Sequence, residues 1–358
     1  MVRKPRKFSQ DLIEEVVAKD LCTGCGACVI SCPANALNLE GGKVVLTHEH
    51  CLGDRCGICY EQCPQLVSDE ALMRILFGDE MTRSDVGFYR GAYSVRSTSP
   101  DISKVCQDGG AVTGILANLL EIGFIDAAIV TGTGDLPWLP EPRIAKSRAD
   151  LLNSAGSKYS LAPLLLVLKD AEEKGYRQLA VVGTPCQIKA IRRMQTSPLK
   201  NKKIVDPVKL CVGLFCLRAF EYQPFAGELR KSLNIELADV DKLSFNGKLV
   251  VHCKDGSSHE LEAKRLRKLA YPHCWACRDF TSSLADISVG GVGSPHGYST
   301  VLIRTQAGAE AFSEAIKGGE LETKPLSEVK PGMDVVEKLA RKKRTIAYAR
   351  ISREGWRS

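Results

Sequence analysis

The number and spacing of cysteines constrain this chain more than any other feature of its sequence. Fifteen of its 358 residues are cysteine, and eight of these lie between positions 22 and 63. The basic N-terminus runs into acidic residues without an apolar core, and Glu121 and Asp126 interrupt the best candidate for a membrane span, residues 111–130. We therefore expect a cytoplasmic protein, in which metal ligation explains many cysteines better than disulfides do.

The first eight cysteines form two runs, and a proline follows each run. The first run is C-x2-C-x2-C-x3-C and the second is C-x4-C-x2-C-x3-C. The first spacing is that of bacterial ferredoxins, in which the last cysteine of each run binds the cluster of the other run. The pattern predicts two four-iron clusters, one on Cys22, Cys25, Cys28 and Cys63 and the other on Cys51, Cys56, Cys59 and Cys32.

Two other kinds of metal site have partly similar spacings. Zinc sites use C-x2-C pairs, but normally as two separated pairs, whereas here each run holds four cysteines. The opening of the second run also occurs in plant-type two-iron proteins, but its close C-P ending favours four irons. We therefore expect a small α+β ferredoxin domain with glycine turns and a short strand at residues 43–46.

From Gly91 onward the sequence alternates between predicted strands and helices. Hydrophobic patterns predict strands at 91–97, 125–132 and 208–216, a helix at 109–122, a helix and then a strand within 161–186, and two strands around a glycine-rich loop within 285–305. This alternation favours an α+β or α/β domain with a mixed sheet covered by helices. We expect a ferredoxin domain at residues 1–68, a linker at 69–90, the large domain at 91–335 and a basic tail at 336–358.

Seven further cysteines lie in the large domain and the loops that connect its elements. Lone cysteines are often small buried hydrophobic residues, and we expect this of Cys106, Cys211 and Cys253. The other four follow apolar strands or form a C-x2-C pair, so they could bind a third cluster. Spacing alone leaves open whether they are ligands or buried hydrophobic residues: Cys186, Cys216, Cys274 and Cys277.

Other motifs limit the function. No G-x-G-x-x-G sequence stands between a predicted strand and a helix, so a Rossmann dinucleotide site is not expected. The net charge of +7 is weak evidence for nucleic-acid binding, because each oxidised cluster with four thiolates carries about −2. His273 and His296 lie near the cysteine and glycine loops and are candidate proton relays; exposed histidines without a role are the alternative.

Several longer motifs, taken in order, resemble one known family. After the two cysteine runs come GAYSVRST, QDGGAVTGIL, GSKYS, VVGTPCQIKAIRRM, VGLFC, CWACRDF and GGVGSPHGYSTVLIRT. The chain is similar, over nearly its whole length, to the family of coenzyme F420 hydrogenase/dehydrogenase beta subunits. With its ferredoxin domain it most resembles the electron-input subunits of archaeal F420H2 dehydrogenase complexes.

The resemblance implies an FAD-binding fold that is not a Rossmann domain and that holds one four-iron cluster. The cluster ligands of the family match Cys186, Cys216, Cys274 and Cys277, which makes three [4Fe–4S] clusters in all. Many family members have an acidic residue where this chain has the loop Gly290–Gly293. The FAD contacts of the family map onto Gly109, Gly110, Thr113, Ser157, Lys158, Tyr159, Thr184, Pro185, Gln187, Gly290, Gly291, Gly293, Tyr298 and Ser299.

The resemblance also implies a reaction, although it assigns no catalytic side chain. Reduced coenzyme F420 gives up a hydride, iron–sulfur clusters accept single electrons, and FAD can do both. The expected path runs from F420H2 to FAD, to the third cluster, to the N-terminal clusters, and then to a redox partner protein or a membrane complex that reduces a quinone or methanophenazine. Two alternatives stay open: an F420-linked subunit of a hydrogenase, formate dehydrogenase or sulfite reductase system, and a non-catalytic electron-transfer adaptor.

Two basic segments are candidates for binding anions. The acidic tail of F420 is expected near Lys264, Arg265, Arg267, Lys268 and Arg278, with a solvated helix face as the alternative. The consecutive basic residues 341–344 could dock on an acidic partner or on lipid headgroups at the cytoplasmic face of a membrane; a solvated tail is again the alternative. No nucleic-acid partner is expected, because no binding module is present.

Overall fold

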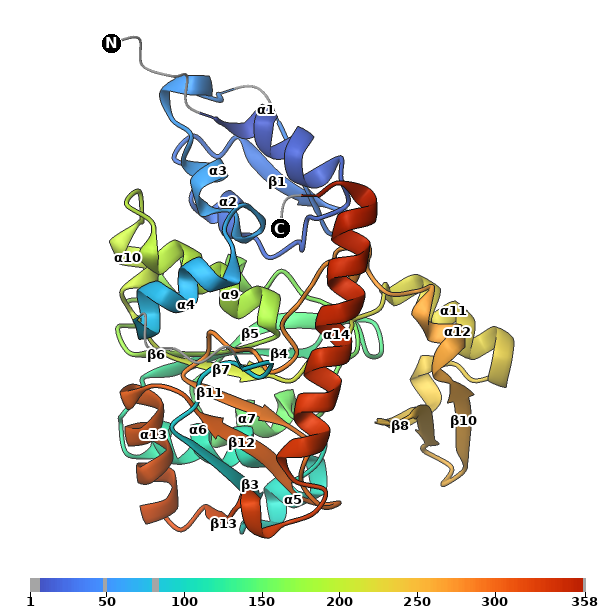
Figure 1. Ribbon diagram of the computed structural model, residues 1–358. Coiled ribbons are helices and arrows are strands. Elements are labelled where there is room, and N and C mark those ends of the chain that lie inside the picture. Colours follow the sequence, from blue (N-terminus) through green and yellow to red (C-terminus); the bar gives the residue numbers. More distant parts are fainter. Residues whose placement is uncertain (1–6, 48–49, 79–83, 357–358) are drawn as a thin grey trace.

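A computed structural model of the protein describes residues 7–47, 50–78 and 84–356. Figure 1 shows a small N-terminal unit above a large α/β body, a lobe that projects from one side of the body, and a long C-terminal helix that reaches the N-terminal unit. Residues 1–6 of the predicted ferredoxin domain and 79–83 of the predicted linker lie outside the described residues.

The N-terminal unit consists of short elements around the two cysteine runs. Its helices are α1 (Ser9–Leu12), extended by a π-helical turn at Ile13–Val17, α2 (Ala27–Ile30) and α3 (Ile58–Gln62). The predicted strand is β2 (Lys43–Leu46), paired antiparallel with β1 (Leu37–Glu40). Gly24 has a φ of +61°, and a Cβ there would lie 2.4 Å from the carbonyl oxygen of Gly42. The cysteine loop can therefore pack on the hairpin turn only because this residue is glycine.

The predicted mixed sheet is present in the body. Within the described residues it has eight strands in the order β13–β3–β12–β11–β7–β6–β4–β5. The neighbours among β4, β6, β7 and β11 are parallel, and the remaining pairs are antiparallel. The strands are β3 (Gly91–Ser97), β4 (Ala127–Thr133), β5 (Pro140–Ala145), β6 (Leu179–Gly183), β7 (Val208–Leu214), β11 (Ile287–Gly290), β12 (Ser299–Ile303) and β13 (Leu321–Pro325).

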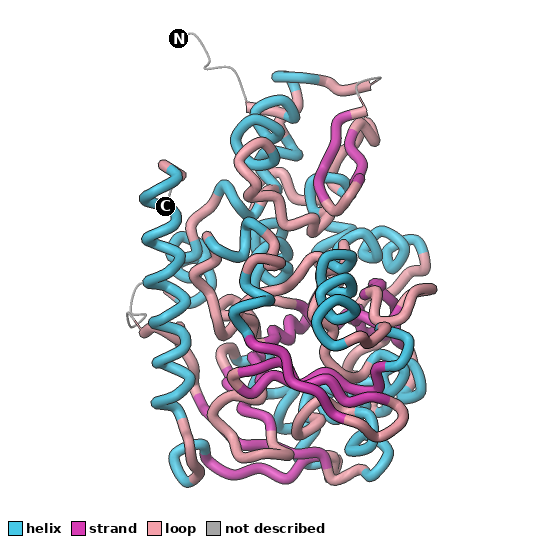
Figure 2. Tube along the Cα trace, turned by 90° about the vertical axis from the view of Figure 1, so that its right-hand side faces the viewer, coloured by secondary structure: helices cyan, strands magenta, loops and turns pink. Residues whose placement is uncertain are grey.

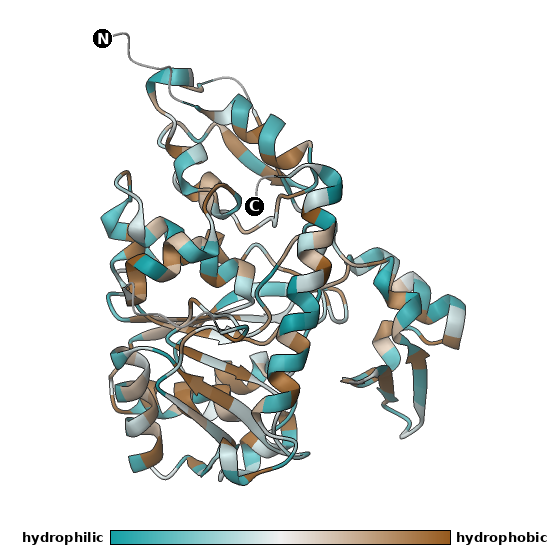
Figure 3. Ribbon diagram, viewed as in Figure 1, coloured by the Kyte–Doolittle hydropathy of each residue, from teal (hydrophilic) through white to brown (hydrophobic). Residues whose placement is uncertain are grey.

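Helices cover both faces of the sheet, as Figure 2 shows. Alternate strand residues face opposite cores: Ala128 and Val130 belong to one cluster of buried side chains, and Ala127 and Ile129 belong to the other. The central strands are rich in hydrophobic residues (Figure 3). The first core is covered by α6 (Ala111–Glu121), α7 (Arg148–Ser154) and α13 (Gln306–Lys317), and the second by α4 (Asp69–Phe77), α8 (Val167–Glu173), α9 (Pro185–Thr196) and α10 (Lys202–Val205).

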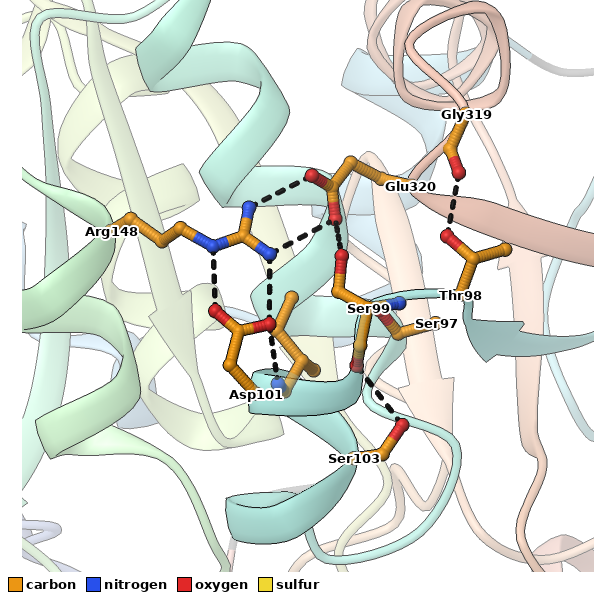
Figure 4. Close-up of polar contacts among 9 residues, drawn as sticks. Ser97, Thr98, Ser99, Asp101, Ser103, Arg148, Gly319 and Glu320 are labelled. Atoms are coloured by element: carbon orange, nitrogen blue, oxygen red, sulfur yellow. Dashed lines mark hydrogen bonds and ion pairs between the residues drawn. The ribbon is translucent and has the colours of Figure 1, made fainter.

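A charged network joins three elements at the edge of the first core. Arg148, at the start of α7, donates from Nε to Oδ2 of Asp101 over 2.8 Å and from Nη1 to Oε1 of Glu320 over 2.8 Å (Figure 4). Asp101 belongs to α5 (Pro100–Val105), and Glu320 directly precedes β13. The guanidinium therefore ties α5 and α7 to the strand at the sheet edge.

The projecting lobe was not predicted from the sequence. It contains an antiparallel sheet of β8 (Val240–Asn246), β9 (Lys248–Cys253) and β10 (Ser258–Glu262), with helices α11 (Tyr222–Leu233) and α12 (Ala263–Arg267). Phe225, Leu229 and Leu249 belong to its own buried cluster. The lobe is inserted between two neighbouring strands of the main sheet, β7 and β11.

The predicted basic tail forms most of helix α14 (Met333–Glu354). Figure 1 shows this helix running along the body toward the N-terminal unit. Arg341 and Arg344 form ion pairs with Asp85, and Lys343 is buried. Three of the four consecutive basic residues thus make contacts within the chain. Among the residues that the structure describes, no helix is both long and apolar enough to span a membrane.

Candidate functional site

The N-terminal unit brings together the four cysteines of the first crossed set, which we call the inner group: Cys22, Cys25, Cys28 and Cys63. Burial raises the pKa of the Cys28 thiol well above its usual value, and the sulfurs of Cys25, Cys63 and Cys22 raise it further. Burial also raises the pKa of Cys63, with contributions from Cys25 and Cys22. The last cysteine of the second run therefore lies with the first three of the first run, which is the crossed arrangement that the spacing predicts.

The second crossed set, the outer group, consists of Cys32, Cys51, Cys56 and Cys59. Burial raises the pKa of Cys59 to about 12, and the other three sulfurs contribute to the shift. All four side chains line one small cavity with a volume of about 20 Å³. Cys51 is exposed, and its Sγ lies 3.1 Å from Oγ of Ser9. The outer group is thus the group closer to the protein surface.

A third group forms at the edge where the parallel strands of the sheet end. Cys186 lies in the first turn of α9, directly after β6, and Cys216 lies two residues beyond β7. Because β6 and β7 are parallel neighbours, their carboxyl ends deliver both side chains to the same edge. The backbone N–H of Cys216 donates to the carbonyl oxygen of Phe280 over 2.9 Å, which holds the segment after Cys277 beside it.

Electrostatic coupling places the C-x2-C pair in this third group. Burial raises the pKa of Cys186 well above its usual value, and Cys277, Cys274 and Cys216 raise it further. Burial raises the pKa of Cys274 to about 12, again with contributions from Cys216 and Cys277. The four residues that spacing alone left open are therefore neighbours in the fold.

These groups fit iron–sulfur clusters. Each brings four sulfurs together, and metal binding displaces the protons from such thiols. Among the described residues, no three His, Cys, Asp or Glu side chains are arranged to hold a single metal ion. A cluster instead distributes its four thiolates over separate irons.

A cavity of about 250 Å³ lies between the third group and the N-terminal unit. Cys186, Cys277 and His273 line it from the body, while Leu21 and Thr23 line it from the N-terminal unit. His273 is only 5% exposed and hydrogen-bonds to the backbone of Cys22. Burial lowers the pKa of His273 to about 4, so the exposed alternative is wrong for this residue. His296, by contrast, is exposed.

Part of the predicted FAD-binding set lies together at the start of α6. The backbone N–H of Gly109 donates to Oγ of Ser299 over 3.1 Å, and a Cβ on Gly109 would lie 2.9 Å from the backbone of Tyr298. Gly110 precedes α6 with a φ of +71° and provides no side-chain cap. The first-turn N–H groups, including that of the buried Thr113, therefore suit an anion such as the pyrophosphate of FAD.

Asp108 is a candidate site residue that the sequence analysis missed. A Cβ on Gly291 would lie 2.4 Å from its Oδ2, which places the carboxyl between the α6 turn and the glycine-rich loop. Partial burial raises the pKa of Asp108, while Lys242 and His296 act in the opposite direction. The signal was present in the sequence as an acidic residue directly before a Gly-Gly turn at a strand edge.

The segment Ser157–Tyr159 is held by neighbouring backbone and side chains. Nζ of Lys158 donates to the carbonyl oxygens of Ser154 and Ala155 over 2.6 and 2.8 Å, at the carboxyl end of α7. Burial lowers the pKa of Lys158 to about 8. Ser157 donates its backbone N–H to Gln107 over 3.3 Å. Burial raises the pKa of the partly buried Tyr159, and Asp108 raises it further. The segment therefore lies near Asp108, but the ammonium of Lys158 donates its hydrogen bonds to the carboxyl end of α7.

The predicted contacts at the start of α9 lie beside the third cysteine group. Thr184 caps this helix: its backbone N–H donates to Oε1 of Gln187 over 2.9 Å. Nε2 of Gln187 donates to the carbonyl oxygen of Ala162 over 2.9 Å, so both ends of its amide make contacts within the chain. Pro185 lines the same cavity as Cys186.

Close packing favours glycine at three positions of the loop Gly290–Gly293. A Cβ on Gly290 would lie 2.3 Å from the ring of Phe215, and one on Gly291 would meet Asp108. Gly293 has a φ of +104° and packs against Val336 of α14. An acidic residue at any of these positions would clash with its surroundings or adopt a strained backbone.

The structure changes two other expectations, the burial of Cys106 and the grouping of the first basic segment. Cys106 is half-exposed rather than buried, and its Sγ lies 2.9 Å from the carbonyl oxygen of Asp108; Cys211 and Cys253 are buried as predicted. The five basic residues of the first basic segment lie in two places. Arg278 pairs with Asp69 and Glu70 of α4, whereas the other four residues lie on or directly after α12: Lys264, Arg265, Arg267 and Lys268.

The fold and the cysteine groups define an iron–sulfur oxidoreductase that transfers electrons. Residues 92–169 match the N-terminal part of the family "Coenzyme F420 hydrogenase/dehydrogenase, beta subunit", residues 176–329 match its C-terminal part, and residues 15–64 match a 4Fe–4S dicluster domain. The chain belongs to this family of coenzyme F420 hydrogenase/dehydrogenase beta subunits and has a ferredoxin domain at its N-terminus.

Individual relatives are similar over most of their length. The beta subunit of the coenzyme F420 hydrogenase of Methanosarcina barkeri is 41% identical over 72% of this chain and 89% of its own. An F(420)H(2) dehydrogenase subunit of Methanosarcina mazei is 32% identical over 93% of this chain and 92% of its own. A chain from the F420-reducing [NiFe] hydrogenase complex of Methanosarcina barkeri has the same fold, with a TM-score of 0.73 and 39% identity over 75% of this chain and 93% of that one.

Proposed function

We propose that this chain oxidises reduced coenzyme F420 and passes single electrons, by way of FAD and three [4Fe–4S] clusters, to a redox partner. FAD, when bound, supplies the exchange between a hydride and single electrons. The observation that carries the proposal is the position of the third cysteine group. It lies at the carboxyl edge of the sheet and, across one cavity, faces the N-terminal unit with its inner cysteine group.

The arrangement of the groups gives the electron path a direction. His273, next to Cys274, contacts the backbone of Cys22, so the inner group is the one adjacent to the third group. Cys51 of the outer group is exposed, whereas Cys25, Cys28 and Cys63 of the inner group are buried. We therefore assign the inner group as the first acceptor in the ferredoxin domain and the outer group as the exit.

The proposed FAD site belongs to a domain at residues 91–335 and uses the α6 turn rather than a Rossmann fingerprint. Gly109, Gly110 and Thr113 would hold the pyrophosphate through backbone N–H groups, with Tyr298 and Ser299 beside them. The ferredoxin domain at 1–68, the linker at 69–90 and the helix-forming segment at 336–358 complete the proposed division. Peripheral binding to a membrane stays a prediction, since most of the basic run 341–344 is engaged within the chain.

The relatives support a dehydrogenase component by coverage and a hydrogenase subunit, the second candidate, by identity. The F(420)H(2) dehydrogenase subunit of Methanosarcina mazei is similar over 93% of this chain, compared with 72% for the hydrogenase subunit. The hydrogenase subunit, however, has the higher identity, 41% against 32%. A native complex that contained this chain and nickel, and that reduced F420 with hydrogen, would establish the hydrogenase function instead.

The test is anaerobic absorbance at 420 nm after the FAD- and iron-replete chain is mixed with reduced F420 and a one-electron dye. NADH is the parallel donor. We expect a rise at 420 nm together with dye reduction, and neither with NADH. No rise despite bound flavin and intact clusters would contradict F420H2 as the donor. A chain that keeps its iron but never binds FAD would favour the adaptor alternative.

A further inference from the structure

Helix α14 carries one charged side chain into the interior at the third cysteine group. Lys343 is 5% exposed, and its Nζ donates to the carbonyl oxygens of Cys216 over 2.6 Å and Asp279 over 2.7 Å. Its neighbour Lys342 is exposed on the same helix. The family match ends at residue 329, so α14 lies beyond the matched region.

The position of Lys343 is unusual for a lysine. Val336, Ala340, Ala347 and Ile351 are buried, and with Lys343 they form one stripe along α14 at spacings of three and four residues. An apolar residue at the centre of this stripe would continue the pattern. A lysine there loses its hydration, which is costly unless a negative charge lies nearby.

The two hydrogen-bond acceptors do not supply that charge, because both are backbone carbonyls. The acidic groups that act on the ammonium are the sulfurs of Cys277, Cys216 and Cys274, which become negative when they bind a cluster, followed by the carboxyl of Asp279. Asp279 already accepts hydrogen bonds from the backbone and hydroxyl of Ser283 over 2.8 and 3.1 Å. The main counter-charge available to Lys343 is therefore the third cysteine group itself.

We propose that Lys343 is a positioning residue that raises the reduction potential of the cluster held by the third cysteine group; this rests on the third cluster of the proposed function. A four-iron cluster becomes more negative by one charge when it accepts an electron. A fixed cation in a poorly hydrated site stabilises the more negative state more strongly. Lys343 thus makes the third cluster a better acceptor, and α14 holds the charge in place.

The test is a redox titration of the full, FAD- and iron-replete chain, followed by electron paramagnetic resonance. The signal that a Cys186→Ala variant lacks identifies the third cluster. Lys343→Met removes the charge and both hydrogen bonds of the ammonium. Lys343→Gln removes the charge but keeps an amide that can donate. Lys343→Arg keeps the charge. Lys342→Met, which removes an exposed charge from the adjacent position, is the matched control.

We expect Lys343→Met and Lys343→Gln to shift the equilibrium of the third cluster at least tenfold toward the oxidised form, which is about 59 mV for a one-electron couple. Lys343→Arg should stay within threefold of the wild type, and Lys342→Met within twofold. The midpoints of the two N-terminal clusters should not move. A merely structural role for Lys343 would change cluster occupancy or stability but not this potential.

The possible outcomes separate this inference from the proposed function. If the wild type and Cys186→Ala have identical spectra, no third cluster exists and both proposals fail. An intact third cluster with an unchanged potential in Lys343→Met and Lys343→Gln would overturn only the role of Lys343. Loss of the cluster in Lys343→Met and Lys343→Gln would show a structural role for Lys343 and would also overturn its proposed effect on the potential.

Discussion

The backbone N–H of Leu165 donates a hydrogen bond to the carbonyl oxygen of Cys25 over 3.1 Å. This contact joins the loop of the inner cysteine group to the segment directly before α8 in the body. Nearby, the buried Gln62 donates from Nε2 to Oγ of Ser197 over 3.0 Å, and Arg193 pairs with Glu61 over 2.7 Å. The ferredoxin domain is therefore fixed on the body through its inner group, which favours electron transfer between the two.

Replacing Gly26 should weaken this contact. Gly26 has a φ of +89°, and a Cβ there would lie 2.8 Å from Cδ2 of Leu166 in the body. Gly26→Ala should cost about 1–2 kcal/mol in backbone strain and about 1–3 kcal/mol more in overpacking. The check is the thermal midpoint of the anaerobic, iron-replete protein.

The matched control for Gly26→Ala is Gly41→Ala. Gly41 also has a positive φ, +55°, but a Cβ there would meet nothing within 4 Å. The Gly41→Ala variant should therefore lose only the stability that backbone strain costs. Equal losses in the two variants would mean that the Leu166 contact adds nothing to stability.

Features encoded in short stretches of sequence could be predicted. The cysteine runs specify which thiols lie together because cluster geometry allows few pairings, and the structure brings Cys63 to Cys28 accordingly. Several strands of the main sheet are short, mostly apolar runs, so β3, β4 and β7 appear close to the predicted residues, whereas the more polar edge strands β5 and β13 were not predicted. The convergence of Cys186 and Cys216 follows from the parallel order of their strands, which the sequence alone does not fix.

Features that depend on tertiary contacts were missed. The strands of the lobe are partly exposed and short, so β10 carries no strong hydrophobic pattern. The four consecutive basic residues at 341–344 indicate a solvated tail, and a buried Lys343 interrupts the apolar stripe that would reveal α14 as a packed helix. Asp108 meets Gly291 only because the glycine-rich loop folds back onto the turn before α6.

Serine variants of Cys63 and Cys51 should separate the two N-terminal clusters. Cys63→Ser should remove the cluster of the inner group, with a loss of about four iron atoms per chain. Since the inner group lies between the third group and the surface, reduction of the outer cluster by F420H2 should also stop. Cys51→Ser should remove the outer cluster and leave reduction of the inner cluster intact.

Freeze-quench electron paramagnetic resonance after mixing with reduced F420 measures both effects. Cys211→Ser serves as the control, because Cys211 is a buried cysteine of the sheet and not part of any group. If Cys63→Ser instead left the Cys22 cluster intact and disrupted the one at Cys51, each run would hold its own cluster. The crossed assignment would then be wrong.

The burial of Lys158 predicts a pH dependence of stability in the alkaline range. Burial, with a contribution from Arg143, lowers the pKa of Lys158 to about 8 from its usual value of 10.5. Between these values the unfolded chain binds more protons than the folded chain, so stability rises with pH. Relative to Lys158→Met, the wild type should become more stable as the pH increases from about 8 to about 10.5.

Thermal midpoints at about pH 7.5, 9 and 10.5 under anaerobic conditions test this prediction. Lys174→Met at an exposed position serves as the control and should give a nearly constant difference from the wild type. A constant difference for Lys158→Met as well would show that the ammonium of Lys158 is not destabilised by burial.

Arg148 should contribute more to stability than an ion pair on the surface. Arg148 and Glu320 are 33% and 13% exposed, so Arg148→Met leaves a mostly buried carboxylate with Ser99 as its remaining partner (Figure 4). We expect a loss of about 1–3 kcal/mol, the usual cost of a buried group that loses its partner. Arg96, which pairs with Glu322 at 51% and 35% exposure, provides the comparison, and Arg96→Met should lose less than about 1 kcal/mol. Thermal midpoints of the two iron-replete variants, measured side by side, decide the point: similar losses would mean that burial of Glu320 does not strengthen the Arg148 network.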